Sequence, residues 1–558
     1  MKKMLLAGLI LSFISGFALL GAAEEGMTAD LVLFNGRVFT VEKSLPWAEA
    51  VAVWEGKIVA VGADAEVKKL IGKDTQAIDL QGKLVLPGFN DAHLHFANGG
   101  LYLLGIDLRP ARDEKEFVSI LNDYIKKLPA GEWITGGNWD HENWPSKKHP
   151  AKELIDAITL DHPVLLQRLD GHMALANSLA LKLAGINRDT PNPQGGEIVK
   201  DKKTGEPSGI LRDNACDLVD AIIPPLTRAR REQAIRTAIR HAQELGVTSI
   251  QDNSSGEDLE IYQELLAKGE LGVRVNAWRR SDCIADFSRL GIHAAFGGPF
   301  LRLGTIKIFS DGSMGAGTAL FFAPYADDPS TCGLPIYKED ELNALVLAAD
   351  KAGLQIATHA IGDKANAWIL NALAQARLEN GVRDSRHRVE HSQVVRPEDV
   401  ARFRELAVIA SIQPSHCIDD MRWAEKRIGS RVNDAYRFAS FLKAGVHLAF
   451  GTDWPVEPLD PMLGIYAAVS RELPAGGPVG GWHPDEKLSL AEAIENYTLG
   501  SAYAEFQEKE KGSIVPGKWA DLAVMENNLF QIPQKDILKT AVAMTILAGK
   551  IIYKKQYN

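Results

Sequence analysis

The sequence has few of the features that mark nucleic-acid-binding, disordered or zinc-finger proteins. Its 558 residues carry a formal net charge of -10, so no broad basic face is available to neutralise phosphates, and we expect no nucleic-acid partner. It has no low-complexity tract, and 46% hydrophobic with 24% charged residues is typical of a folded protein with a sizeable core. Its widely spaced cysteines form no CxxC pair, which excludes a zinc finger, and we expect free buried thiols at Cys216, Cys283, Cys332 and Cys417.

Long apolar runs are also missing, except at the amino terminus. There Lys2 and Lys3 precede an apolar run that ends in the small residues Gly21, Ala22 and Ala23, a pattern typical of a cleaved export signal. An uncleaved anchor is the alternative, because the run approaches the length of a short membrane span. We predict a signal peptide over residues 1–23, export to the periplasm or the extracellular space, and no stable membrane association after cleavage.

Two β-rich segments lie on either side of a long central region. Residues 27–88 and 509–558 both show short apolar alternation broken by Gly at turns, which is typical of short strands. Strands of this length are marginally stable alone. We therefore predict that the two segments join into one small composite β-sandwich.

The central region, residues 89–508, alternates strand-like apolar runs with amphipathic helical stretches. This alternation predicts an α/β fold with a parallel sheet and helical crossovers, and we favour a closed (β/α)₈ TIM barrel. Nine candidate strands compete for eight places, so one of HPVLLQ, GVTSIQ and VRVNAW must lie outside the barrel. The stretch from about 108 to 228 is too long for one crossover, and we predict an insertion that covers or walls the active-site mouth.

Potential metal ligands stand at or just past the ends of separate predicted strands. His93 and His95 are one residue apart on a strand, so both imidazoles point to the same side. His359, His391 and Asp453 each follow another predicted strand, and parallel barrels assemble active sites at these carboxyl ends. Imidazole nitrogens and carboxylate oxygens are good zinc ligands. We predict one or two divalent ions, most readily zinc.

Several sequence strings resemble those of the amidohydrolase superfamily, and within it the YtcJ-like branch that includes N-substituted formamide deformylases. They are VLPGFNDAHLHF, IKIFSDGSMGAGTA, THAIGDKA, VEHSQ, FGTDWPVEP and GSIVPGKWADLAV. The resemblance covers nearly the whole chain after the predicted signal. It implies a metal-dependent hydrolase with a (β/α)₈ barrel and a small composite β-sandwich. It also implies the metal ligands: His93 and His95 after the first strand, His359 after the fifth, His391 after the sixth and Asp453 after the eighth.

Lys307, in IKIFSDG, lies where many members of the superfamily place a lysine at the end of the fourth strand. An ammonium group is no metal ligand, but carbamylation by carbon dioxide would give an anionic group whose oxygens could bridge two ions. The resemblance therefore implies a carbamylated Lys307 as a ligand. An unmodified lysine paired with Asp311 is the alternative.

The predicted reaction is hydrolysis of a carbon–nitrogen bond other than a peptide bond, as in an N-substituted amide or formamide. Asp453 would take a proton from water and return it to the leaving nitrogen. Trp139 and His172, in the insertion, are candidate substrate-binding residues, with plain packing as the alternative. The expected partner is a small-molecule substrate, and a homodimer stays open. Hydrolysis of an ester or lactone at the same site, or an exported binding or regulatory protein without turnover, are the alternative functions.

Three further histidines carry weaker expectations. His416 follows the seventh predicted strand and could approach a substrate, although no partner for it is evident. His387 lies four residues before His391, deeper in the strand, and we expect a structural role. We expect His447 in the core.

Overall fold

The central feature of the structure is an eight-stranded parallel barrel. The computed structural model describes residues 28–556, so the predicted signal peptide lies outside the described residues. The barrel strands pair in chain order: β8 (Phe89–Leu94), β15 (Val247–Asn253), β16 (Arg274–Arg280), β18 (Leu301–Phe309), β19 (Gln355–Ala360), β20 (Arg388–His391), β21 (Ile409–Ile412) and β22 (Leu448–Phe450). The chain after β22 returns to β8, where the backbone N–H of Asp453 donates to the carbonyl of His93 at 2.7 Å. The predicted TIM-barrel fold is confirmed.

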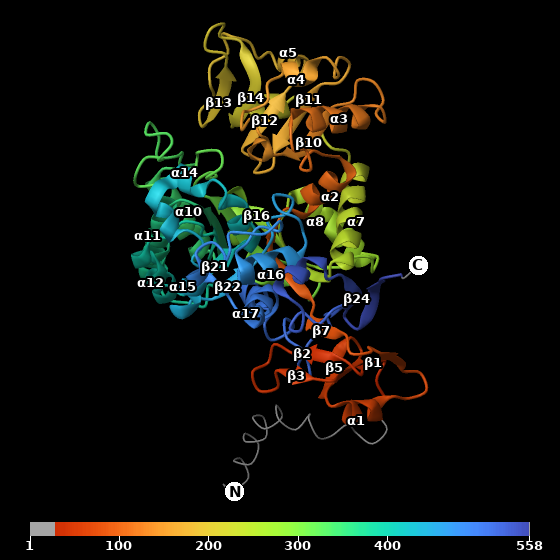
Figure 1. Ribbon diagram of the computed structural model, residues 1–558. Helices are drawn as coiled ribbons and strands as arrows, with labels where there is room; N and C mark the ends of the chain where they lie inside the picture. The colour runs from red at the N-terminus through yellow and green to blue at the C-terminus, as the bar shows by residue number, and fades with distance from the viewer. Residues whose placement is uncertain (1–27, 557–558) are drawn as a thin grey trace.

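Helices cover the outside of the barrel (Figure 1). Helix α7 (Arg228–Glu244) shows the reason: its buried residues, from Ala234 to Ala242, recur at helical spacing on one face, and the Thr227 side chain caps its first turn. The other helices of the barrel region are α2 (Phe96–Leu104), α8 (Gly256–Ala267), α9 (Ile284–Leu290), α10 (Glu339–Lys351), α11 (Asp363–Asn380), α12 (Pro397–Glu405), α13 (Pro414–Asp420), α14 (Ala424–Ile428), α15 (Phe438–Lys443), α16 (Pro461–Ser470), α17 (Leu490–Glu495) and α18 (Ser501–Ala504).

Between α2 and α7 the chain forms a separate sheet that lies over one end of the barrel (Figure 1). Its strand order is β13 (Gly196–Lys200), β14 (Pro207–Asp213), β12 (Met173–Ala176), β11 (Val164–Arg168), β10 (Ile134–Trp139) and β9 (Ile106–Asp107). Helices α3 (Glu114–Ile125), α4 (Glu153–Asp156), α5 (Ser178–Leu183) and α6 (Asp217–Asp220) accompany it. The run HPVLLQ forms β11, so it is the surplus strand, whereas GVTSIQ and VRVNAW supply β15 and β16 of the barrel.

The two ends of the chain form two further sheets. One has the order β5 (Lys57–Gly62), β4 (Ala50–Trp54), β1 (Leu31–Phe34) and β6 (Gln76–Asp79). The other joins β2 (Arg37–Phe39), β3 (Trp47–Ala48) and β7 (Leu84–Pro87) to the late strands β23 (Leu522–Met525), β24 (Val542–Leu547) and β25 (Lys550–Lys554). One apolar cluster contains residues of both sheets, among them Leu31, Val53, Leu522 and Ile546. The sheets therefore pack as the composite sandwich that the two β-rich segments predict.

Two smaller expectations concern cysteines and membrane spans. All four cysteines are free, and Cys216 and Cys417 are buried, but Cys283 and Cys332 are only half-buried. Among residues 28–556, no helix has both the length and the apolar character that crossing a membrane needs.

A buried ion pair connects the barrel to the composite sandwich. Arg274 opens barrel strand β16, and its guanidinium contacts the Asp521 carboxylate through Nε at 2.6 Å and a terminal nitrogen at 2.9 Å. Arg274 is 2% exposed and Asp521 5% exposed. Each of these two buried charges is compensated by the other. Removing either one alone would therefore leave an unpaired charge in the interior.

We expect Asp521→Ala to destabilise the protein by about 3–5 kcal/mol, because it strands the Arg274 guanidinium in the interior. The measurement is the midpoint of thermal and urea unfolding. Asp286→Ala is the control, since it removes an exposed contact with Arg289 and is expected to leave the midpoint nearly unchanged. Equal midpoints for the two variants would contradict the stabilising role of the buried pair.

Candidate metal centre

Asp453, His93 of β8 and His95, which directly follows β8, form the centre of the site. The Asp453 Oδ1 atom lies 3.3 Å from Nε2 of His93 and 3.3 Å from Nε2 of His95. His93 is fully buried and Asp453 is 7% exposed. The backbone φ is +59° at Asp453 and +74° at His391, a region that residues other than glycine seldom adopt. Such backbone strain clusters where a side chain must be aimed at a ligand.

Three of the histidines have one ring nitrogen committed to a neighbouring acceptor. His93 Nδ1 contacts Glu390 Oε2 at 2.6 Å, and His391 Nδ1 contacts Gln413 Oε1 at 2.8 Å. His359 Nε2 lies 3.0 Å from the carbonyl oxygen of Gly312. When each of these nitrogens donates its proton, the opposite nitrogen keeps a lone pair that can bind a cation. The contacts therefore prepare His93, His359 and His391 as neutral ligands.

The rings of these histidines gather around one space. The ring centroids of His359 and His391 are 4.5 Å apart, and those of His93 and His391 are 5.0 Å apart. Burial, followed by the neighbouring Lys307, lowers the pKa of His359 to about 3. Burial likewise holds the pKa of His391 well below its usual range. Both imidazoles are therefore neutral at physiological pH, the form that binds a metal.

Lys307 lies in the same space. Its side chain is 1% exposed, and Nζ is 3.1 Å from His93 Nε2. Burial lowers the pKa of Lys307 to about 8, against the opposing effect of Glu390 and Asp453. The alternative partner, Asp311, instead accepts backbone N–H groups from Leu320, Ile361 and Gly362. The amine is therefore directed at the candidate ligands.

The donor set fits a divalent cation. Oδ1 of Asp453 is buried, and no hydrogen-bond donor reaches it within the part of the chain that the structure describes. Although burial raises its pKa, the imidazoles of His93 and His95 hold the pKa of Asp453 well below its usual range, so it is a carboxylate. A buried anionic oxygen without a donor, beside two imidazole nitrogens, is what a zinc-like ion satisfies.

The sequence analysis missed a buried ion pair, Arg388–Glu390, whose carboxylate contacts His93. Glu390 is fully buried between His93 and Arg388, whose Nε contacts Glu390 Oε1 at 2.5 Å. Arg388 also donates to the carbonyl of Ala92 at 2.7 Å and contacts Gln251 and Ser411. The signal in the sequence was the motif RVEH itself, since charged residues at alternate positions of a buried strand need partners inside the barrel.

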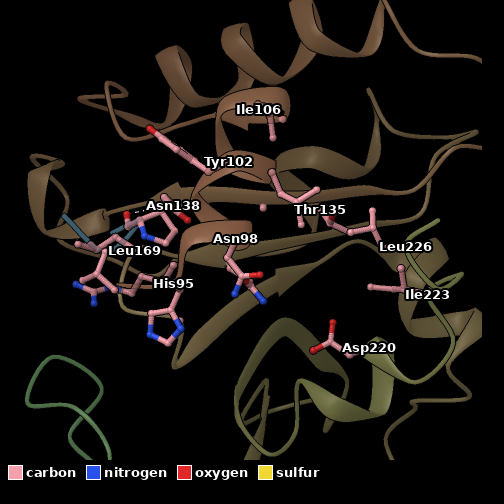
Figure 2. Close-up of a pocket in the computed structure, with 18 of the residues that line it drawn as sticks. His95, Asn98, Tyr102, Ile106, Thr135, Asn138, Leu169, Asp220, Ile223 and Leu226 are labelled. Carbon is pink, nitrogen blue, oxygen red and sulfur yellow. Dashed lines mark hydrogen bonds between the residues drawn. The ribbon is translucent and has the colours of Figure 1, made fainter. Parts of the chain in front are cut away.

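A cavity of about 1200 Å³ leads from the metal centre to the insertion. His93, His95, Lys307, His359, His391 and Asp453 line its inner end. Figure 2 shows His95 together with Asn98 and Tyr102 of α2 and with residues of the insertion such as Thr135 and Asn138, all of which line the cavity. The insertion therefore walls the mouth of the site.

The two candidate substrate-binding residues have different positions. His172 lines the cavity and contacts Asp213 through Nδ1 at 2.8 Å. Trp139 is fully buried in the apolar cluster of the insertion, where its Nε1 donates to the carbonyl of Leu166 at 2.7 Å. It does not line the cavity, because a register shift between Gly137 and Trp139, with φ of +50° at Asn138, interrupts the alternation along β10, and Asn138 lines the cavity instead. The packing alternative therefore holds for Trp139.

The three remaining histidines have different surroundings. His416 has the partner that the sequence did not reveal: Gln393 Nε2 lies 3.2 Å from His416 Nδ1, and His416 Nε2 lies 4.0 Å from Asp453 Oδ2. His387 contacts Asp350 at 2.9 Å, a structural role as expected. The expectation for His447 was wrong: it directly precedes β22, its side chain is exposed, and its ring stacks on that of Tyr503.

Comparison with known proteins gives the family. A family model described as the amidohydrolase family matches residues 76–553. The chain belongs to the amidohydrolase family. It is 36% identical to the Arabidopsis thaliana protein LONG AFTER FAR-RED 3, over 95% of this chain and 92% of that one. It is 33% identical to the putative amidohydrolase YtcJ of Bacillus subtilis, over 93% and 99%. It is 26% identical to the N-substituted formamide deformylase of Arthrobacter pascens, over 94% and 98%.

A solved structure agrees. An uncharacterised metal-dependent hydrolase from Pyrococcus horikoshii OT3 is 30% identical, with a TM-score of 0.74 over 90% of this chain and 99% of that one. The resemblance seen in the sequence is thus confirmed, and this amidohydrolase is a metal-dependent hydrolase.

We expect Glu390→Gln to weaken metal binding by about tenfold to a hundredfold, because the charge that orients His93 and raises its basicity is lost. The dissociation constant would be measured by competition with a coloured chelator. Glu508→Gln is the matched control, since Glu508 pairs with Arg386 outside the cavity. Unchanged metal affinity in the Glu390 variant would contradict its supporting role.

Proposed function

We propose that this amidohydrolase cleaves a carbon–nitrogen bond other than a peptide bond, in an N-substituted amide or formamide. The observation that carries the proposal is the placement of Asp453. Its Oδ1 faces the imidazoles of His93 and His95, whereas its Oδ2 lies 4.0 Å from His391 Nδ1 and 4.0 Å from His416 Nε2. One oxygen is thus suited to holding a cation and the other to exchanging a proton. The relative named N-substituted formamide deformylase supports this substrate class.

We assign the metal ligands as follows. Asp453, His93 and His95 would hold one ion, His359 and His391 would hold a second, and a carbamate on Lys307 would bridge them, with zinc preferred. When bound, the metal supplies a Lewis acid that lowers the pKa of water from 15.7 to about 7 and polarises the substrate carbonyl.

The residues of the chain would then move the proton and position the substrate. Asp453 accepts a proton from the attacking water and donates it to the leaving nitrogen, because an amide nitrogen departs readily only after protonation. The carbon–nitrogen bond breaks, and a carboxylic acid and an amine leave. His172 lines the wall of the insertion as a substrate-binding residue. Against the effect of burial, the hydrogen bond to Asp213 raises the pKa of His172, which favours the form that donates to a substrate oxygen.

An ester or lactone would meet the same attacking water, so the carbonyl alone does not select among these substrates. Proton return to a leaving nitrogen, however, is needed for an amide far more than for an ester. A binding protein without turnover would need Asp453 as a metal ligand but not as a group that carries a proton. The position of Asp453 therefore favours amide hydrolysis.

We expect Asp453→Asn to lower kcat by about a hundredfold to ten-thousandfold, since the group that carries the proton is lost. His95→Ala should lose both metal and turnover while the fold is retained. The measurements are elemental analysis, circular dichroism and hydrolysis of a panel of N-acyl and N-formyl amines before and after chelation. Turnover of the Asp453 variant at the parental rate would remove its assigned role, and a metal-loaded parent without turnover on any member would favour the binding protein.

We expect Lys307→Ala to lose one of two metal equivalents, because the bridging carbamate is gone. Added short carboxylic acids, which can occupy the vacated space, should restore the lost equivalent in part. Native mass spectrometry of the parent should show the mass of one added carbon dioxide. Full metal content in the Lys307 variant without added acid would contradict the carbamate.

A further inference from the structure

A second, smaller cavity of about 70 Å³ adjoins the metal centre. It shares Asp453, His391 and His359 with the main cavity. Its other wall carries three acidic residues: Asp419 and Asp420 at the end of α13, and Glu457 in the loop that follows β22. Its volume admits only a few non-hydrogen atoms. A substituent attached near the scissile bond could therefore enter it, but a large ring could not.

The acidic residues of this side pocket are incompletely neutralised. Asp419 contacts Arg422 at 2.5 Å, and Asp420 accepts a hydrogen bond from the Tyr436 hydroxyl. Among the described residues that line the pocket, Arg168 is the one arginine or lysine, and its guanidinium contacts Asp140 at 3.0 Å and Asp170 at 2.7 Å. Burial raises the pKa of Asp420 to about 8, so this carboxyl group ionises readily only when a cation enters the pocket.

Glu457 is the least compensated of the three. It is 7% exposed, and within residues 28–556 no hydrogen-bond donor contacts its carboxyl group. The cation that contacts it is Arg109, with a guanidinium nitrogen 3.8 Å from Glu457 Oε2. The other terminal nitrogen of Arg109 donates to the carbonyls of Pro455 and Val456. Burial, followed by the charge of Asp419, raises the pKa of Glu457 to about 8. A carboxyl group that lines a cavity and has only a distant cation can be compensated by a positively charged ligand that enters the cavity.

A second buried acceptor lines the same pocket. Gln393 is 5% exposed, and its side-chain amide faces His416, with Nε2 at 3.2 Å from His416 Nδ1. Its Oε1 is buried and receives no hydrogen bond from the described part of the chain. On the far side of His416, Nε2 is also buried and without a hydrogen-bond partner there. The missing partner of the glutamine oxygen is a donor.

We propose that the side pocket binds a positively charged nitrogen of the substrate, an ammonium or guanidinium group placed a few bonds from the scissile amide. This proposal rests on the proposed function, since it names the substrate class of the same site. An organic cation fits Asp419, Asp420 and Glu457 better than a metal ion does, because the group that could hold a metal ion in this pocket is His391, His416 and Asp453 on its other wall. A nitrogen with several N–H donors can instead contact acceptors that lie farther apart.

The first test compares two substrates of equal shape, N-formyl diaminopropane and N-formylbutylamine. They differ in a terminal ammonium against a terminal methyl group. We expect the parent to prefer the charged substrate in kcat/KM by about tenfold or more, the usual worth of a charge-assisted hydrogen bond. Glu457→Gln should lower this ratio by about tenfold, and Asp419→Asn should lower it as a second variant. Glu425→Gln, on the exposed surface of α14, should keep the parental ratio.

The second test measures binding without turnover. N-formyl diaminopropane and N-formylbutylamine are titrated calorimetrically into metal-loaded Asp453→Asn protein, with and without the Glu457→Gln change. Tighter binding of the charged formamide that depends on Glu457 supports the side pocket even if no amide is hydrolysed, a result that would contradict the proposed function alone. Turnover with equal kcat/KM for both formamides, together with equal binding of both, would overturn the side-pocket proposal and leave the hydrolase function unchanged.

Discussion

The site depends on one constraint: a carboxylate is buried at the end of the barrel without enough donors of its own. Desolvation penalises such a group strongly unless a positive partner is present. Here the imidazoles of His93 and His95 contact it from one side, and the barrel presents Lys307, His359 and His391 around the same space. A metal ion held there would therefore also be a structural partner of these interior groups. Its loss would leave mutually close polar groups without compensation.

A second layer of charge makes this arrangement rigid. The Arg388–Glu390 pair is fully buried in the barrel and contacts His93 through Glu390. A buried pair of this kind contributes little net stability, because its Coulomb attraction is offset by desolvation. The pair instead orients a ligand: because Glu390 contacts Nδ1 of His93, the other ring nitrogen, Nε2, faces the cavity. Gln413 and the carbonyl of Gly312 do the same for His391 and His359 at lower electrostatic cost.

Much of this was predictable from the sequence, and the failures have physical reasons. The convergence of His93, His359, His391 and Asp453 on one cavity was predictable, because parallel barrels place functional residues at the carboxyl ends of their strands. The surplus strand HPVLLQ was not separable by pattern, since a buried strand of a second sheet has the same apolar run as a barrel strand. Trp139 was misplaced because facing along β10 depends on register, which one residue inverts.

Contacts between residues far apart in the sequence could not be predicted, because no local sequence pattern encodes them. Glu390 contacts His93 although 297 residues separate them in the sequence, and the contact between Gln393 and His416 depends on how the segment after β20 packs against helix α13. The same limit explains why the acidic side pocket is visible only in three dimensions. Asp419 lies in helix α13 after β21 and Glu457 in the loop after β22, and each alone resembles an ordinary surface carboxylate.

This division between strands and loops has a functional consequence. The strand ends hold the groups that any hydrolysis of a carbonyl needs, and they are fixed by barrel geometry. The insertion and the loops after β21 and β22 form the walls, and such segments can change without disturbing the barrel. The main cavity is large and of mixed character, so it discriminates weakly by shape alone. Discrimination by charge requires a small, buried and uncompensated pocket beside the reacting bond, because solvent would screen the same carboxylates at the rim. In this chain that pocket lies next to Asp453, where its carboxyl groups would contact a charged leaving amine.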